Sequence, residues 1–387
     1  MGMGRACLVV VLSIVAACGD GVPKPAAVDP VSTSEAEEFA RKFEAAMNPC
    51  DAGKLDALID VETLLRRATE KADAPPAAKR GFLDGARSGA NVSTMLCQGV
   101  TAAADASYSL LRVRDTGGQP RPLFRLLGDG KVNYHELELG KSRQDHKIRA
   151  VDLHIYVSGE SLSDTLASLL EQSVASAKGG GNIDAAARTM RDIRDAQNRG
   201  EGREVRRLIG TLPPQLRQAK AFRLLEVMVA ADLDEATYGE LIAGYEKSFP
   251  DDPSLDMVSI DGYYLRKNAT AALAAIDRID RRVGGDPYNG LLRASAHLLD
   301  PTPEHLAEAD KWAQVTTEAM PTHQNGWWTL ATVRLTRGDH AGVVPVLDKL
   351  EQDFGVSFDR AAMASEPVWQ GFLQSPEFAA WWAKRGR

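Results

Sequence analysis

Hydrophobic residues recur every three or four positions through the first quarter of the chain, a spacing typical of amphipathic helices. Phe39, Phe43 and Met47 share one face of the first such segment, and a capping box at 34–37 marks its start. Proline and asparagine residues interrupt the pattern twice. It therefore predicts three helices, over residues 34–47, 54–71 and 77–100.

The hydrophobic period changes from 3.6 to 2 after residue 106, as it does when helices give way to strands. Short turns rich in Gly and Asp separate four alternating segments, which predict a four-stranded antiparallel meander. The strands are expected over 107–114, 121–127, 131–139 and 148–157, and a helix over 161–177. From residue 182 onwards the pattern is helical throughout, with short breaks.

This organisation predicts an α+β N-terminal domain over 34–177, with helices packed on the meander, followed by an all-α domain over 182–387. The order of three helices, four strands and a closing helix resembles the nuclear-transport-factor-like α+β cone. That resemblance implies a curved sheet wrapped on helices, with a pocket at the wide end. Three short segments are also similar to uncharacterised bacterial repeat proteins, a likeness that implies no activity: 123–126, 133–137 and 157–160.

The helical breaks of the second domain fall at a nearly constant spacing, which indicates a repeated hairpin. Residues at tetratricopeptide-repeat positions occur in the unit 325–354: Trp327, Leu330, Ala331, Gly338 and Asp339. Segment 213–355 resembles such repeats in degenerate form, and an irregular helical bundle is the alternative. The resemblance implies stacked hairpins, closed by an aromatic C-terminal cap, whose groove takes a protein or peptide partner.

Strand alternation also groups side chains that carry chemistry. Matching the apolar faces of the last two strands sets tyrosine, histidine and carboxylate side chains together on the other face, and leaves His135 on the core face. The candidate pocket residues are Arg112, Arg125, Tyr134, His135, Glu136, Asp152, His154 and Tyr156. Such a group can act in acid–base catalysis or hold a small ligand, but cross-strand charge pairs on a sheet are the simpler interpretation, so no catalytic residue is assigned.

Composition narrows the classes of function. The 387 residues are 44% hydrophobic, which is ordinary for globular domains, and the formal net charge of -7 argues against nucleic acid as a partner. A phosphate-binding loop and a histidine pair at metal spacing are both missing, so we expect no cofactor and no metal. Segment 129–136 is similar to half of a calcium loop, but Arg125 and Leu127 occupy the first ligand positions and exclude it.

The N-terminus predicts the compartment. Arg5 precedes an apolar run over 6–17, whose 12 residues would span about 18 Å as a helix, too short for a bilayer. Val15-Ala16-Ala17-Cys18 resembles a bacterial lipobox. The resemblance implies that residues 1–17 are a removed signal peptide, that Cys18 is acylated, and that 18–33 form a flexible tether to the cell envelope. Gly19, where an aspartate would resemble an inner-membrane retention signal, favours the outer membrane.

Processing would leave two unmodified cysteines, Cys50 and Cys97. An even number in an oxidising compartment favours a disulfide between them, and two buried thiols are the alternative. We therefore expect a lipid-anchored envelope protein that acts as a protein-binding scaffold through its repeats, most simply without enzymatic activity. The alternative is a small-ligand-binding protein or enzyme with a pocket in the α+β domain.

Lipidation makes a direct prediction. Cys18→Ser removes the only thiol that the lipobox could acylate, so the variant should accumulate as an unprocessed precursor or leave the membrane fraction. Fractionation and intact-mass measurement of both proteins check this. A mature wild-type mass without acyl chains would contradict it.

Overall fold

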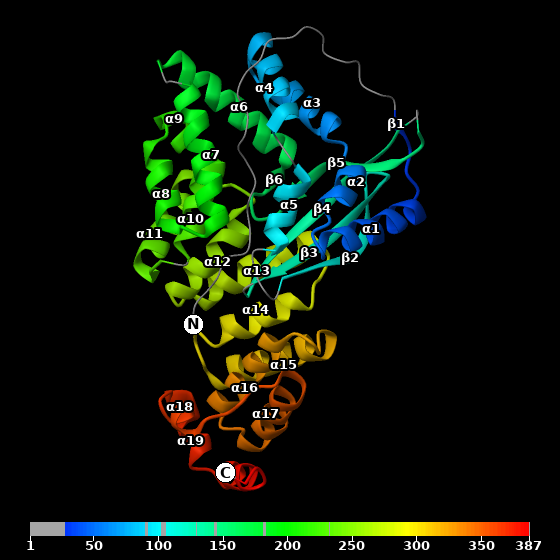
Figure 1. The fold of residues 1–387 in the computed structure, drawn as a ribbon. Coiled ribbons are helices and arrows are strands. Elements are labelled where there is room, and N and C mark those ends of the chain that lie inside the picture. The colour runs from blue at the N-terminus through cyan, green and yellow to red at the C-terminus, as the bar shows by residue number, and fades with distance from the viewer. Residues whose placement is uncertain are drawn as a thin grey trace. The chain divides into compact units, whose positions relative to one another are not determined.

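The computed structural model describes residues 28–89, 92–101, 106–128, 130–142, 145–180, 183–231 and 233–386. The predicted signal peptide, Cys18 and most of the tether lie outside this part of the chain. The structure divides into two compact units, one ending at Leu255 and one beginning at Asp256 (Figure 1). All six tryptophans fall in the second unit. Among the described residues, every helix is too short or too polar to cross a bilayer.

The first unit opens with helices that the sequence predicted in outline. They are α1 (Thr33–Met47), α2 (Ala52–Leu58), α3 (Val61–Lys71), α4 (Pro76–Gly89) and α5 (Val92–Thr101). The capping box of α1 is formed by Ser32 and Glu35, two residues earlier than predicted. The predicted helix 54–71 is divided in two, because Ile59 takes an extended conformation beside Ala150 and Asp60 then caps α3.

The sheet is an antiparallel meander with two short additions. Its main strands are β2 (Ser107–Thr116), β3 (Gln119–Gly128), β4 (Lys131–Ser142) and β5 (Ile148–Ile155), each hydrogen-bonded to the next. They correspond to the four predicted strands. Strand β6 (Glu160–Ser161) pairs with β5, and β1 (Val28–Asp29) pairs with the end of β4. The alternation of hydrophobic and polar residues could not predict these two strands, because a strand of two residues is too short to show a period.

The β2–β3 hairpin parts from β4 halfway along that strand. Strand β3 pairs with β4 from Gly128↔Lys131 to Leu123↔Glu136, whereas β1 pairs with the same strand only at Lys141 and Ser142. Residues 137–140 of β4 therefore have a strand neighbour on the β5 side only. A cavity forms at the gap on the other side.

One face of the sheet packs on α1, α2, α5 and α6 (Leu162–Lys178). Phe43 of α1 contacts the rings of Tyr108 and Phe124, which are buried on β2 and β3. Helix α1 also covers the edge of β2. Asn48 accepts the Tyr108 N–H and donates to its carbonyl, both at 2.9 Å, while Glu44 accepts the Leu110 N–H at 2.8 Å. These side chains replace a strand neighbour and protect the edge from pairing with another chain.

The helices that follow α6 belong to the same unit as the sheet. They are α7 (Ile183–Arg199), α8 (Gly202–Thr211), α9 (Pro214–Arg217), α10 (Lys220–Ala230) and α11 (Glu235–Ser248). Leu169 of α6 is buried with Ile193 and Phe222 in a second hydrophobic cluster. The predicted domain boundary at 177–182 therefore lies inside the first unit, because α6 packs against the sheet-side core on one flank and these helices on the other.

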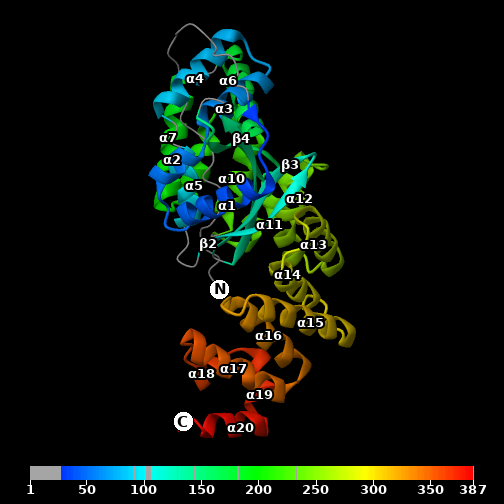
Figure 2. The same cartoon turned by 90° about the vertical axis from the view of Figure 1, so that its right-hand side faces the viewer.

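The second unit is helical, and its helices α13 to α17 each pack against the next (Figure 2). They are α12 (Leu255–Leu265), α13 (Ala269–Val283), α14 (Tyr288–His297), α15 (Pro303–Ala319), α16 (Gln324–Arg337), α17 (His340–Phe354), α18 (Arg360–Ala364), α19 (Gln370–Leu373) and α20 (Pro376–Ala383). Gly338 ends α16 with φ of 72°, and Asp339 caps α17 by accepting the Gly342 N–H. Leu330 and Ala331 are buried, and Trp327 donates from Nε1 to the Pro321 carbonyl.

A glycine at the β5–β6 turn allows the backbone to pack closely against the segment that contains Ser254. Gly159 has φ of 68°, and a Cβ there would lie 2.5 Å from the Ser254 nitrogen. Gly159→Ala should destabilise this unit by about 2–4 kcal/mol, from left-handed strain and a backbone clash. Gly117→Ala is the control, because φ is 64° there but no atom lies within 4 Å.

Hydrogen exchange of the β5 amides, read by mass spectrometry, measures both changes. Tryptophan fluorescence is unsuitable, since it reports on the second unit alone. Equal destabilisation by the two substitutions would show that strain, and not the close approach to Ser254, decides the outcome.

Candidate functional site

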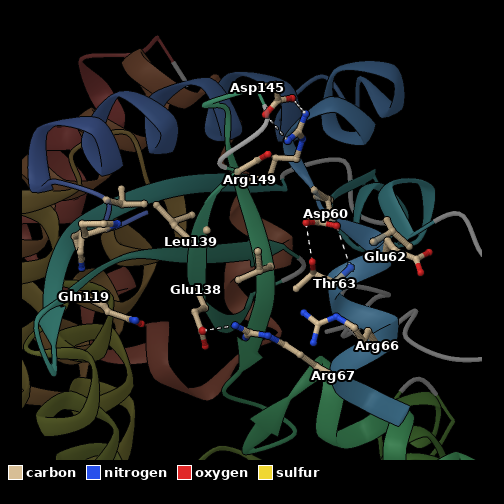
Figure 3. Close-up of a pocket in the computed structure, with 18 of the residues that line it drawn as sticks. Asp60, Glu62, Thr63, Arg66, Arg67, Gln119, Glu138, Leu139, Asp145 and Arg149 are labelled. Carbon is tan, nitrogen blue, oxygen red and sulfur yellow. Dashed lines mark hydrogen bonds and ion pairs between the residues drawn. The ribbon is translucent and has the colours of Figure 1, made fainter. Parts of the chain in front are cut away.

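A cavity of about 900 Å³ lies where the β2–β3 turn separates from β4 (Figure 3). Its remaining walls are the start of α3 and the adjoining ends of β4 and β5. Charged and polar side chains make up about half of the lining: Asp60, Glu62, Thr63, Arg66, Arg67, Gln119, Glu138, Asp145 and Arg149. Smaller apolar residues fill the space between them: Pro30, Val31, Ile59, Val61, Pro120, Leu139 and Val151. This volume is at the upper end of what small-molecule sites occupy.

Helix α3 supplies one wall, and its N-cap faces the cavity. Asp60 accepts the Thr63 N–H at 2.9 Å through one oxygen and the Thr63 hydroxyl at 2.8 Å through the other. The Asp60 N–H in turn donates to the Ala150 carbonyl at 2.9 Å. The capping carboxylate is thus held by its own helix and by the edge of the sheet, which fixes it relative to the cavity.

Two arginines follow on α3, nearly two turns after Asp60. Arg67 reaches across to β4 and bonds Glu138 at 2.7 Å, while Arg121 of β3 bonds the other Glu138 oxygen at 3.2 Å. Arg66 bonds Glu70 at 2.8 Å. Burial by itself would raise the pKa of Glu138, but the hydrogen bond and charge of Arg67 outweigh it, so this pKa lies below its usual range.

An ion pair closes the opposite end of the cavity. Arg149 of β5 bonds Asp145 at 2.7 Å, and this contact holds the pKa of Asp145 well below its ordinary value. The same pair raises the pKa of Arg149, with a further contribution from the charge of Asp60. This pairing therefore favours the charged forms of both Asp145 and Arg149.

None of the eight candidate pocket residues from the sequence lines this cavity. Tyr134, Glu136, His154 and Tyr156 do lie together on the expected sheet face, where Arg114 joins them. Arg114 donates to both Glu136 oxygens at 2.8 Å and to the Tyr156 hydroxyl at 3.0 Å. The Tyr156 ring meets those of Tyr134 and His154 edge-on, with centroids 5.8 and 5.0 Å apart.

Three further candidates lie outside this cluster of Tyr134, Glu136, His154 and Tyr156: Asp152, Arg112 and Arg125. Asp152 is buried, accepts both the N–H and the hydroxyl of Ser163, and lies 3.8 Å from Arg67, so it ties α6 and α3 to β5. Arg125 is opposite Tyr134 in the β3–β4 register, and Arg112 is opposite Leu123 across a bulge in β2.

His135 lies on the core face, as predicted, beside the Tyr108 ring at 5.6 Å. Its Nε2 is 3.2 Å from the Asn133 amide, and its Nδ1 has no hydrogen-bond partner among the described residues. Burial, with a smaller effect from His154, lowers the pKa of His135 to about 4. The imidazole is therefore neutral at physiological pH and part of the core.

The structure describes the side chain of only one of the two cysteines that we expect to form a disulfide. Cys50 forms a disulfide. The side chain of Cys97 lies outside the described residues, although its helix, α5, packs against α1 and α2 on either side of Cys50. The pairing of these two cysteines stays a prediction.

Sequence reasoning missed the residues that do line the cavity. Their only local signal is the pair Asp60 and Thr63, which has the spacing of a helix N-cap. Among the described residues, no group of three or more His, Cys, Asp or Glu side chains is arranged to hold a metal ion. Comparison of the chain with protein-family models, curated protein sequences and solved structures gives no match.

The buried His135 predicts a pH dependence of stability. Its folded-state pKa of about 4 lies below the unfolded value of about 6.5, so the unfolded chain takes the proton first. The stability from the neutral ring is complete above pH 6.5 and is lost as the pH falls toward 4, by about 3 kcal/mol.

His135→Gln should flatten the stability profile over this pH range, measured by hydrogen exchange of the β4 amides. His146→Asn, at an exposed turn where asparagine tolerates the left-handed backbone, should leave the profile unchanged. If His135→Gln keeps the wild-type dependence of stability on pH, His135 is not the cause of that dependence.

Proposed function

We propose that this protein is a lipid-anchored envelope protein that binds a small polar ligand in the cavity between α3 and the sheet. The observation that carries the proposal is the cavity itself. Its charged side chains are already fixed by Asp60–Thr63, Arg67–Glu138 and Asp145–Arg149 before a ligand arrives. Pre-positioned polar groups lower the entropy lost on binding and so favour a specific ligand.

The proposal is one of binding, without a reaction. The group that most resembles acid–base machinery is Glu136 with His154 and Tyr156, and it lies outside the cavity lining. Both Glu136 oxygens accept from Arg114, which favours a structural role for that carboxylate. We also propose that the α+β part is related to the nuclear-transport-factor-like cone, for which a binding module is the expected role.

The N-terminal tether would hold this cavity close to a membrane. If Cys18 is acylated and becomes the first residue, ten residues separate it from Val28, which at full extension reach about 35 Å. Pro30 and Val31 at the end of β1 line the cavity, so the tether begins at its rim. We place the protein in the bacterial envelope, with the outer membrane favoured, and pair Cys50 with Cys97.

A second candidate function is a protein-binding scaffold on the helical hairpins, which we describe as tetratricopeptide-like. The supporting observation is a set of half-buried tryptophans with cations on their faces. Arg293 lies 4.7 Å and Lys311 5.5 Å from the Trp312 centroid, and Lys349 lies 5.5 Å from that of Trp327. Tryptophan and arginine are enriched at the energetic centres of protein interfaces.

Blocking the cavity separates the two candidates. Gln119 is exposed at the rim and makes no hydrogen bond through its side chain among the described residues, so Gln119→Trp should fill the mouth without loosening the fold. A thermal-shift panel of small polar compounds should stabilise the wild type and Gln119→Ala, but not Gln119→Trp.

Ligands that stabilise all three proteins equally would place binding elsewhere. Retention of a co-purifying protein by Gln119→Trp, and its loss in Trp327→Ala, would favour the scaffold instead.

A further inference from the structure

Among the described residues that line the cavity, Asp60 is a carboxylate that forms no ion pair. Asp60 is half-buried, and its two oxygens accept from Thr63, but within the described part of the chain no basic side chain forms an ion pair with it. Arg149, whose pKa is raised in part by the charge of Asp60, is bonded to Asp145. Each carboxylate oxygen accepts two hydrogen bonds, so Asp60 keeps the capacity to receive an ammonium group.

On the same wall, Arg66 keeps donors for an anion. One of its terminal nitrogens bonds Glu70, and its other N–H groups have no partner among the described residues. The side chain is only 16% exposed and lies at the cavity wall beside Arg67 (Figure 3). A guanidinium with a free edge matches the geometry of a carboxylate.

The spacing of these two residues along the helix sets the length of a ligand that lies beside α3. Asp60, the N-cap, and Arg66 are six residues apart, so their Cα atoms are about 9 Å apart along the helix axis at 1.5 Å per residue. An extended peptide advances about 3.3–3.6 Å per residue, so three residues span about 10 Å. A single amino acid that lies along α3 is too short to extend from one position to the other.

We propose that the cavity binds a short peptide of about three residues through its free termini, the ammonium at Asp60 and the carboxylate at Arg66. This inference rests on the proposed function and specifies its ligand. Small apolar residues of the lining, among them Pro120, Leu139 and Val151, suit small aliphatic side chains. The lining residues within the described part of the chain include no aromatic ring on which a sugar or a nucleobase would stack.

Ligands of a single charge fit less well. A purely anionic ligand would meet Asp60, Glu62 and Asp145, and a purely cationic one would meet Arg66, Arg67 and Arg149. A ligand with opposite charges at its two ends avoids both repulsions. Electrostatic complementarity thus selects a zwitterion.

The test compares trialanine with its N-acetyl form, its C-terminal amide and free alanine, by calorimetry on the full chain. Trialanine should bind, and each capped form and alanine should bind at least tenfold more weakly. Asp60→Asn should weaken trialanine at least tenfold and leave N-acetyl-trialanine unchanged, because asparagine can still cap α3. Arg66→Gln should weaken trialanine likewise and leave the amide unchanged.

Arg207→Gln is the control, since Arg207 forms an exposed ion pair with Glu204 on α8. Equal affinity of the capped forms, or no heat with trialanine at millimolar concentration, would overturn the peptide assignment. These wild-type measurements need no variant to fold. The proposed function would survive that result if another compound still stabilised wild type but not Gln119→Trp, and would fall if no compound did.

Discussion

The arrangement of the first unit depends on a short backbone contact between the α2–α3 junction and the edge of β5. Ile59 is extended beside Ala150, and the Asp60 N–H donates to the Ala150 carbonyl. This contact ends α2, starts α3, and fixes the direction in which α3 leaves the sheet. Because α3 is held there, Arg67 reaches Glu138 on β4 and Asp60 faces the cavity.

The charged side chains on this edge stabilise the fold only as a connected set. Glu138 receives hydrogen bonds from Arg67 and Arg121, and buried Asp152 receives two from Ser163. Removing a carboxylate from water carries a large desolvation penalty, which several good hydrogen bonds can offset. The network therefore holds α3, β3, β4 and α6 in one geometry, and a rigid frame is what a binding cavity at their junction needs.

Helix α6 explains why the sheet and the following helices form one unit. Leu166 and Leu170 face the core under the sheet, whereas Leu169 faces the cluster of α7 to α10. Lys220 of α10 also bonds both Glu160 of β6 and Asp252. A glycine-rich segment after α6 suggested a domain boundary, but α6 has apolar residues on two sides and packs in both directions.

The sequence by itself determined the features that depend on near neighbours. The change of hydrophobic period located β2 to β5, the alternation placed His135 on the core face, and the Gly338–Asp339 pair marked the turn between α16 and α17. Only the tertiary structure decided where the cavity lies. It forms because β3 leaves β4 after Glu136 and because Ile59 joins the edge of β5 from a distant segment. Periodicity reports which side chains are buried, whereas a cavity depends on where paired backbones separate, and that has no local signature.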